Sequence, residues 1–290
     1  MLHWLDANFV SLLNGVAVGM LLFTMAVGLS LIFGLMDVLN LAHGAVFMLG
    51  SYVAFHLVDE GRRFVPALLA AVVLGAGLGV GMAFAVRPLV RRGPLDQALL
   101  TLGLAFVLSN LALAVWGTDF HSVRPPPSLG GSVDLLGHTY PVYRLAIIVL
   151  GLVLAAAVHL VVERTRLGAV IRAAVVDRAM VSALGINVSL LLVGVFAAGV
   201  VLAAFGGVVG APVLNVRPGL DSEVLILALL VVVIGGLGSL RGAFVGALLI
   251  GQVQALGVAL LPQQSSFLLF GAMALILLAR PSGLFGDAAR

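Results

Sequence analysis

The chain has 290 residues, of which 62% are hydrophobic and only 9% are charged, and its mean hydropathy is +1.24. Soluble domains carry roughly a quarter charged residues, so a chain this apolar cannot cover its surface with polar groups and must face lipid. It contains no cysteine and no lysine, which excludes disulfides, thiolate metal sites, Schiff-base chemistry and an ATP-binding P-loop of its own.

Apolar runs follow one another along the whole chain. A transmembrane helix needs about 20 mostly apolar residues, and eight uncharged runs qualify, with a shorter ninth: 9–33, 42–58, 64–86, 98–116, 145–162, 189–211, 224–240, 242–261 and 267–279. Backbone groups find no water in a bilayer, so we expect helices, and the alternating segments typical of β-barrels are absent. The sequence predicts an all-α, polytopic membrane protein with eight or nine transmembrane segments in a single domain, 1–290.

The arginines predict the orientation. The loops 87–97 and 163–187 are arginine-rich and are separated by two spans, so they lie on the same side, which the positive-inside rule makes cytoplasmic. The opposite side receives 59–63, 117–144, 212–223 and 262–266. The first run is too long for a signal-peptide core, and we expect it to be retained. The N-terminus is outside if 42–58 crosses fully and cytoplasmic if that run is re-entrant.

Charge is missing from the predicted spans. None of the nine runs contains Asp, Glu or Arg, and only Asp37, between the first two, is a candidate for membrane depth. Ion-driven carriers usually place such groups within the bilayer. This pattern disfavours a stand-alone carrier or channel, and the lack of clustered titratable groups disfavours a membrane-embedded enzyme.

The first break in the apolar pattern is Gly34–Gly44, a polar, glycine-flanked interruption. Transporters place substrate sites where helices are discontinuous, because free backbone ends can bind the cargo. The alternative is an ordinary tight connection in which Asn40 and His43 cap helices. His43 has no second His or Cys at ligand spacing, so a metal site is not expected.

The stretch Glu163–Asn187 is the longest predicted cytoplasmic segment. It lacks proline, and its apolar residues recur at helical spacing between arginines, which predicts a short amphipathic helix. Such a helix either lies on lipid headgroups or docks into a groove of a partner protein.

A second break, Gly235–Phe244, has the same plan as the first. An apolar run, a glycine-rich interruption and a Gly-Ala pair follow in order, as at Gly44-Ala45 and Gly242-Ala243. Paired breaks in two halves suggest an inverted repeat. The predicted translocation-path residues are therefore Asn40, His43, Gly44, Gly235, Gly236, Gly238 and Gly242.

Glycines also recur inside the spans. Gly75, Gly77, Gly79 and Gly81 lie in one run, and Gly206, Gly207 and Gly210 in another. Small residues at helical spacing let membrane helices approach closely. We expect packing within the chain, in preference to a dedicated dimer motif.

Three segments resemble the LivH-type permeases of branched-chain amino acid ABC importers. They are the stretch from Asn40-Leu41-Ala42-His43-Gly44 to Tyr52, the pattern from Arg166-Leu167-Gly168 to Gly185-Ile186-Asn187, and the stretch from Val233 to Ala243. The family commonly has a basic residue after the Arg-Leu-Gly triplet, where this chain has Ala169. The resemblance covers nearly the whole chain.

The resemblance implies a multi-pass subunit of the bacterial inner membrane that works with partners. These would be a second, LivM-like permease, two LivG/LivF-like ABC ATPases that hold ATP and magnesium, and a periplasmic substrate-binding protein; no cofactor in this chain and no nucleic acid are expected. The substrate would be a branched-chain amino acid, with urea, short amides or other amino acids as alternatives. The ATPase-coupling residues would be Arg166, Leu167, Gly168, Arg172, Ala173, Asp177, Met180, Leu184, Gly185, Ile186 and Asn187.

Overall fold

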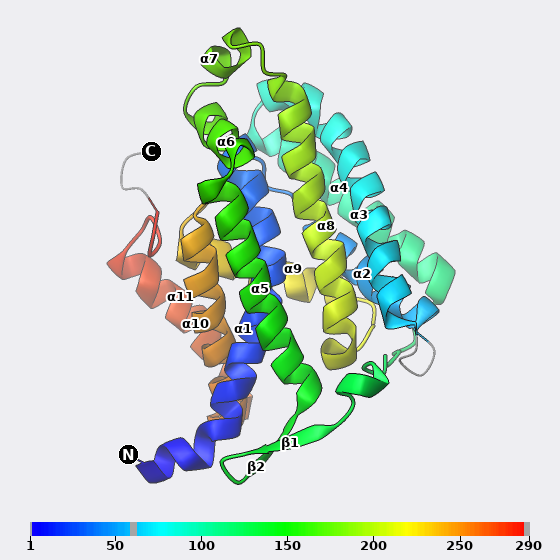
Figure 1. Ribbon diagram of the computed structural model, residues 1–290, viewed down its shortest axis with the longest axis vertical. Helices are drawn as coiled ribbons and strands as arrows, with labels where there is room; N and C mark the ends of the chain where they lie inside the picture. Colours follow the sequence, from blue (N-terminus) through cyan, green and yellow to red (C-terminus); the bar gives the residue numbers. More distant parts are fainter. Residues whose placement is uncertain (1, 59–62, 287–290) are drawn as a thin grey trace.

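The computed structural model describes residues 2–58 and 63–286, which are mostly helical (Figure 1). In chain order the elements are α1 (Leu2–Met36), α2 (His43–Leu57), α3 (Phe64–Val86), η1 (Arg87–Arg91), α4 (Pro94–Trp116), η2 (Pro127–Leu129), β1 (Ser132–Leu135), β2 (His138–Pro141), α5 (Val142–Arg164), α6 (Arg166–Val176), α7 (Arg178–Ala183), α8 (Val188–Leu214), α9 (Leu220–Gly235), α10 (Leu240–Leu260), η3 (Pro262–Gln264) and α11 (Ser265–Ala279).

Seven helices among the described residues are long and apolar enough to cross a bilayer. These are α1, α3, α4, α5, α8, α10 and the stretch 262–279 around α11. The remaining two predicted runs form α2 and α9, which have only 15 and 16 residues, and about 20 are needed for a full crossing. The predicted polytopic helical class with discontinuous helices is confirmed, and the inverted repeat remains a prediction.

The two ends of the bundle differ in what they carry. In Figure 1, α6 and α7 lie at one end, and the β-hairpin and the start of α1 lie at the other. Arg87 and Pro88 line a cavity together with Ser189, so the arginine loop 87–97 is at the α6–α7 end, as the orientation argument predicts. The rings of Phe9 and His138 are 5.7 Å apart, which places the start of α1 beside the hairpin. This is the arrangement expected if 42–58 belongs to a full crossing.

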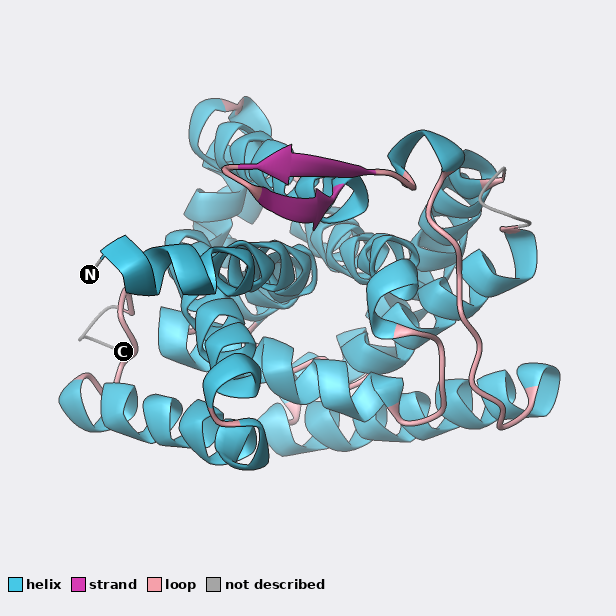
Figure 2. Cartoon of the chain, turned by 90° about the horizontal axis from the view of Figure 1, so that it is seen from below, coloured by secondary structure: helices cyan, strands magenta, loops and turns pink. Residues whose placement is uncertain are grey.

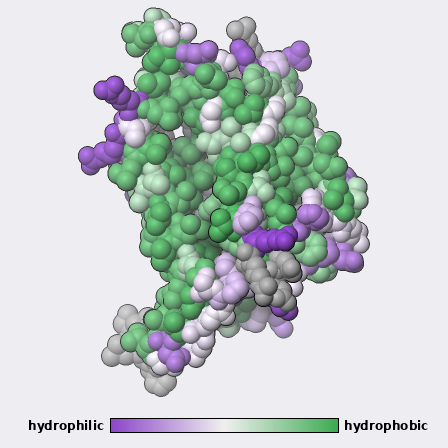
Figure 3. All heavy atoms as spheres, turned by 45° about the vertical axis from the view of Figure 1, so that its right-hand side comes forward, coloured by the Kyte–Doolittle hydropathy of each residue, from purple (hydrophilic) through white to green (hydrophobic). Residues whose placement is uncertain are grey.

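The helix α1 is central, whereas α4, α5 and α11 are peripheral. In the most apolar window of α1, 78% of the residues are buried, compared with 17% in α4, 11% in α5 and 6% in α11. The peripheral helices expose large apolar side chains such as Phe106, Val149 and Leu275. Figure 3 shows the result on one face: hydrophobic residues cover the middle of the molecule and hydrophilic ones gather toward its ends. Such a surface suits lipid contact.

Glycine contacts let the central helices approach closely. A Cβ atom on Gly28 of α1 would lie 3.2 Å from the Gly199 Cα of α8, and one on Gly19 would lie 2.8 Å from the Ala247 carbonyl oxygen of α10. Five of the seven span glycines singled out above pack within the chain in this way: Gly75, Gly79, Gly206, Gly207 and Gly210. Gly77 and Gly81 have no such neighbour. Packing within the chain is therefore confirmed for those five.

The only sheet among the described residues is a two-stranded hairpin. Strand β1 pairs antiparallel with β2, with Ser132 opposite Pro141. Figure 2, seen from the hairpin end, shows the strands lying across one edge of the helical bundle. The hairpin lies in the predicted outer loop 117–144, where polar residues and the Pro125–Pro127 run prevent a further span.

Candidate functional site

The first break separates α1 from α2 by six non-helical residues. The helix α1 ends at Met36, Asp37 has a positive φ of 58°, and α2 begins at His43. His43 is fully buried, and its Nε2 donates to the Met25 carbonyl, 3.1 Å away in the middle of α1. The chain therefore returns from the end of α1 to its middle before α2 starts.

Neither Asn40 nor His43 caps α2 as the tight-connection alternative requires. The N-cap residue is Ala42, which has no capping side chain. The Asn40 Oδ1 accepts a hydrogen bond from the Ala42 amide at 3.2 Å, within the break itself. Asn40 Nδ2 and His43 Nδ1 are buried and have no hydrogen-bond partner within the part of the chain that the structure describes. Buried polar atoms of this kind are costly, and they often mark functional positions.

Thr101 of α4, which was not among the predicted site residues, holds the break in place. Its Oγ1 lies 3.0 Å from the Leu39 carbonyl and 3.2 Å from the Leu41 amide. The side chain is fully buried. Non-helical backbone at membrane depth needs such partners, because no water satisfies it there. A threonine inside an uncharged run was the only signal in the sequence.

The start of α9 meets the start of α2, which corrects the prediction that 212–223 is wholly an outer loop. The helix begins at Leu220, directly after the left-handed Gly219, so Asp221 and Glu223 occupy its first turn. The helix dipole favours acidic residues in this first turn. A search for uncharged apolar runs does not detect a helix start that carries them. A Cβ on Gly44 would overlap the Asp221 carbonyl oxygen, so the two helix starts are in direct contact.

The second break lies at the other end of α9. Gly236 and Gly238 have φ values of 103° and 79°, and the Ser239 hydroxyl caps α10 by accepting from the Gly242 amide at 3.0 Å. A Cβ on Gly238 would lie 2.7 Å from the Gly34 Cα, so this break packs against the end of α1. The amides of Leu284 and Phe285 donate to the last carbonyls of α9, at 2.8 and 3.0 Å.

The predicted translocation-path residues therefore form two groups. Asn40, His43 and Gly44 lie near the start of α9, and Gly235, Gly236, Gly238 and Gly242 lie at its end. A helix of 16 residues is about 24 Å long. The structure does not bring the two groups into one pocket, and their role in translocation remains a prediction.

The segment 163–187 forms two helices instead of the single one predicted. Asp177 separates α6 from α7, and its Oδ1 accepts from the Met180 amide at 2.9 Å. Thr165 caps α6 through the Gly168 amide at 3.1 Å, and Asn187 caps α8 through the Leu190 amide at 3.1 Å. Each cap satisfies an amide that the helix start leaves free. The polar residues of the motif thus determine the shape of the segment.

The two glycines of the motif allow its sharp turns. A Cβ on Gly168 would overlap the Val162 carbonyl oxygen where α5 turns into α6. Gly185 has a φ of 82° and follows the end of α7. Side chains larger than hydrogen are disfavoured at both places.

Apolar side chains project from this segment. Leu167, Met180 and Leu184 are 54%, 61% and 72% exposed, while Ile171 and Val181 are buried against the bundle. Of the other predicted coupling residues, Arg166, Ala173 and Asp177 are exposed and Ile186 is half-buried. The buried set attaches the segment to the bundle, and the exposed set forms an apolar face that no part of residues 2–58 and 63–286 covers.

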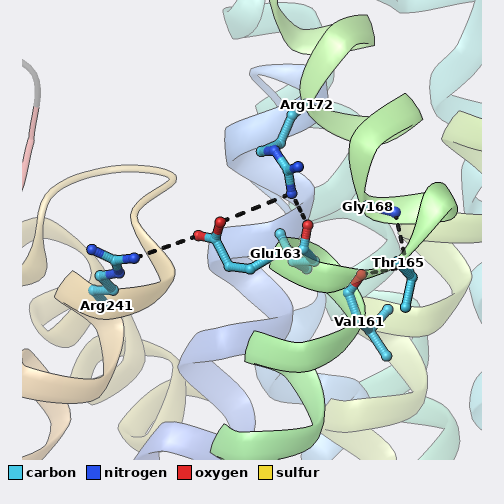
Figure 4. Close-up of polar contacts among 7 residues, drawn as sticks. Val161, Glu163, Thr165, Gly168, Arg172 and Arg241 are labelled. Atoms are coloured by element: carbon cyan, nitrogen blue, oxygen red, sulfur yellow. Dashed lines mark hydrogen bonds and ion pairs between the residues drawn. The ribbon is translucent and has the colours of Figure 1, made fainter.

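Two polar contacts tie the segment to the two breaks. Glu163 lies between Arg172 of α6 and Arg241 of α10, at 4.0 and 3.9 Å (Figure 4), and Arg172 also donates to the Val162 carbonyl. Arg178 Nη2 donates to the Leu35 carbonyl at 2.8 Å, next to the first break. Arg178 and Arg241 were not among the predicted coupling residues, because only the fold brings their partners close.

A cavity of about 1170 Å³ lies among these contacts. Its walls include the end of α1, the second half of α6, the second break and residues 281–286. Its charged lining residues are Asp37, Glu163, Arg172, Arg178 and Arg241. The predicted coupling segment and both breaks therefore border one space at the α6–α7 end of the molecule.

Comparison with known proteins adds independent findings. The family model described as "Branched-chain amino acid transport system / permease component" matches residues 11–278. The chain is 29% identical to the high-affinity branched-chain amino acid transport system permease protein BraD of Pseudomonas aeruginosa, over 95% of this chain and 94% of that protein. It is 28% and 27% identical to the LivH permease proteins of Escherichia coli K12 and Salmonella typhimurium, over 94% of each chain. No solved structure matches the chain.

Proposed function

The chain belongs to the family of permease components of branched-chain amino acid transport systems, and we propose that it is one of two permease subunits of an ATP-driven importer of branched-chain amino acids in a bacterial inner membrane. It is a multi-pass membrane protein and an ABC transport subunit that works with other components of its system. The single observation that carries the proposal is the family match over residues 11–278.

The partners proposed for this chain follow from its lack of lysine and from the apolar side chains that α6 and α7 expose. Without lysine it has no P-loop of its own, so ATP and magnesium would be held by two separate ATPase subunits. The apolar face of α6–α7, with Leu167, Met180 and Leu184 exposed, suits docking into a groove of such a subunit. A second, LivM-like permease would complete the path, and a periplasmic binding protein would deliver the amino acid to the hairpin end.

The proposed mechanism is a transfer of movement from the ATPases to the breaks. Closure of the ATPases would displace α6 and α7, which are bonded to the end of α1 through Arg178 and joined to α10 through Glu163. The Arg178 contact ends beside the first break, and the contact between Glu163 and Arg241 ends beside the second. The rigid helices on either side of each break would then pivot at its non-helical residues. This movement would change the side of the membrane to which the path is open.

Affinity purification of the tagged chain from its native membrane in mild detergent tests the proposal. We expect mass spectrometry to identify two ATPases and a second permease in stable association, with the binding protein recovered when substrate is present. Recovery of this chain alone, stable and monodisperse, would contradict the importer assignment and favour a stand-alone carrier or channel.

The Glu163–Arg241 contact gives a charge-swap prediction. Glu163→Arg and Arg241→Glu are each expected to lower transport per ATP hydrolysed. The double variant is expected to recover part of it, because the swap restores opposite charges between positions 163 and 241 but leaves position 163 with the same charge as Arg172. Both side chains are substantially exposed, so we expect each single change to cost less than about 1 kcal/mol of stability. The measurement is leucine uptake against phosphate release in proteoliposomes. Equal losses in the single and double variants would show that the pair does not transmit movement.

A further inference from the structure

Asp221 is an acidic group in a mostly apolar region without a cationic partner. Its carboxylate accepts a hydrogen bond from the Ser109 hydroxyl of α4 at 2.6 Å. The neighbouring acid, Glu223, pairs with Arg217, but no ion pair involves Asp221 among residues 2–58 and 63–286. A carboxylate within a membrane protein is costly and usually has a function. The start of α9 offsets part of that cost through its dipole, and one hydrogen bond leaves further acceptor sites on the carboxylate unused.

Seven residues along α4 from Ser109, on the same face of that helix, Trp116 packs on Tyr52. The Tyr52 side chain is fully buried, and its OH has no hydrogen-bond partner among residues 2–58 and 63–286. The Tyr52 ring stacks on Trp116, with centroids 5.0 Å apart, and the buried Trp116 Nε1 is also unpaired. Buried unsatisfied polar atoms on the helix face that also carries Ser109 indicate a polar ligand, and aromatic faces attract an ammonium group.

The group can be reached from the surface of the subunit. Asp221 and Ser109 are half-buried, and their chain neighbours Ser222 and Asn110 are exposed. Around them the surface is apolar, with Phe106 62% exposed. A polar strip of this kind on a lipid-like surface is expected to face a water-filled path or a partner permease.

We propose that Asp221 binds the α-ammonium group of the amino acid during its passage, and that Tyr52 and Trp116 border this subsite. This inference rests on the proposed function and adds the recognition of one substrate group to it. The ligand class is a zwitterionic amino acid with a free primary ammonium. Asp221 contributes a charge that neutral backbone groups at the breaks do not supply.

The test compares variants that separate charge from structure. Asp221→Asn keeps an acceptor for Ser109 and removes the charge, whereas Ser109→Ala removes the hydrogen bond and keeps the charge. The complete transporter is reconstituted in proteoliposomes with its binding protein, and uptake of L-leucine and stimulation of ATP hydrolysis are both measured. Asp221→Glu and Tyr52→Phe are measured alongside.

We expect Asp221→Asn to lower uptake at least about tenfold, in line with the strength of a charge-assisted hydrogen bond, with ATP hydrolysis still stimulated. Ser109→Ala and Tyr52→Phe should lose less, and Asp221→Glu should retain part of the uptake. Normal uptake by Asp221→Asn, or an equal loss in Ser109→Ala, would overturn the inference. If Asp221→Asn fails to assemble, uptake by Asp221→Glu no better than background overturns it as well. A wild-type complex without leucine-stimulated ATP hydrolysis would count against the proposed function instead.

Discussion

Alanine in place of Gly207 is expected to prevent α2 from packing on α8. A Cβ at this position would overlap the Phe47 carbonyl oxygen and lie 2.9 Å from the Ser51 amide nitrogen. Both are backbone atoms of a buried helix, so neither can move aside as a flexible side chain would. The Ser51 hydroxyl also donates to the Gly207 carbonyl at 2.9 Å, and this bond requires the close approach. Overpacking typically costs about 1–3 kcal/mol, and we expect the upper end here or loss of the folded protein.

Gly194→Ala is the matched control, because Gly194 lies on the same helix and a Cβ there meets nothing within 4 Å. The measurement is the yield of monodisperse protein in size-exclusion chromatography and its thermal midpoint in detergent. Gly207→Ala should lower both strongly, and Gly194→Ala should change neither. Equal behaviour of the two variants would show that the α2–α8 contact does not limit folding.

Alanine at Asp177 is expected to abolish coupled transport while the protein still inserts and folds. The side chain is exposed, and its main contact is the cap on α7. Loss of such a cap costs about 1 kcal/mol, which is too little to unfold the bundle but enough to release a helix of six residues. Arg172→Ala should act in the same direction, because Arg172 contacts both the Val162 carbonyl and Glu163. Leucine uptake should fall to background while ATP hydrolysis continues.

The conservative variant Asp177→Asn separates two explanations. Asparagine caps helices about as well as aspartate, so this variant should transport normally if the shape of α7 is what matters. Loss in both Asp177→Asn and Asp177→Ala would assign the role to the carboxylate charge at the ATPase contact. Normal coupled transport in Asp177→Ala and Arg172→Ala would show that 163–187 is not the coupling segment.

Much of the fold was predictable because the residues that determine the membrane insertion of each helix are neighbours in the sequence. Uncharged runs of sufficient length identify the spans, and clustered arginines identify one end of the bundle. The polar position Asp177 and the glycine Gly168 lie where α6–α7 turns. The location of the predicted coupling segment and of its turns therefore follows from residues close together in the sequence.

The contents of the candidate site depended on contacts between distant parts of the chain. The apolar pattern predicts an outer loop at Asp221, whereas this residue lies in the first turn of α9 beside Gly44, which is 177 positions earlier in the sequence. Thr101 and Ser109 lie in an unremarkable apolar run, and only the fold shows that one holds the first break and the other bonds to Asp221.

The sequence by itself determined that the chain is a helical membrane protein, where its helices are interrupted, and at which end the arginine-rich segment 163–187 lies. Only the tertiary structure decided that α2 and α9 are short helices whose starts meet, and that the first break runs from the end of α1, beside the second break, to the start of α9. The physical reason is that the hydropathy and charge of a residue indicate whether its surroundings are apolar or aqueous. The pairing of helices depends on close backbone contacts at glycines. The spacing of these glycines in the sequence does not reveal which other helix each one will contact.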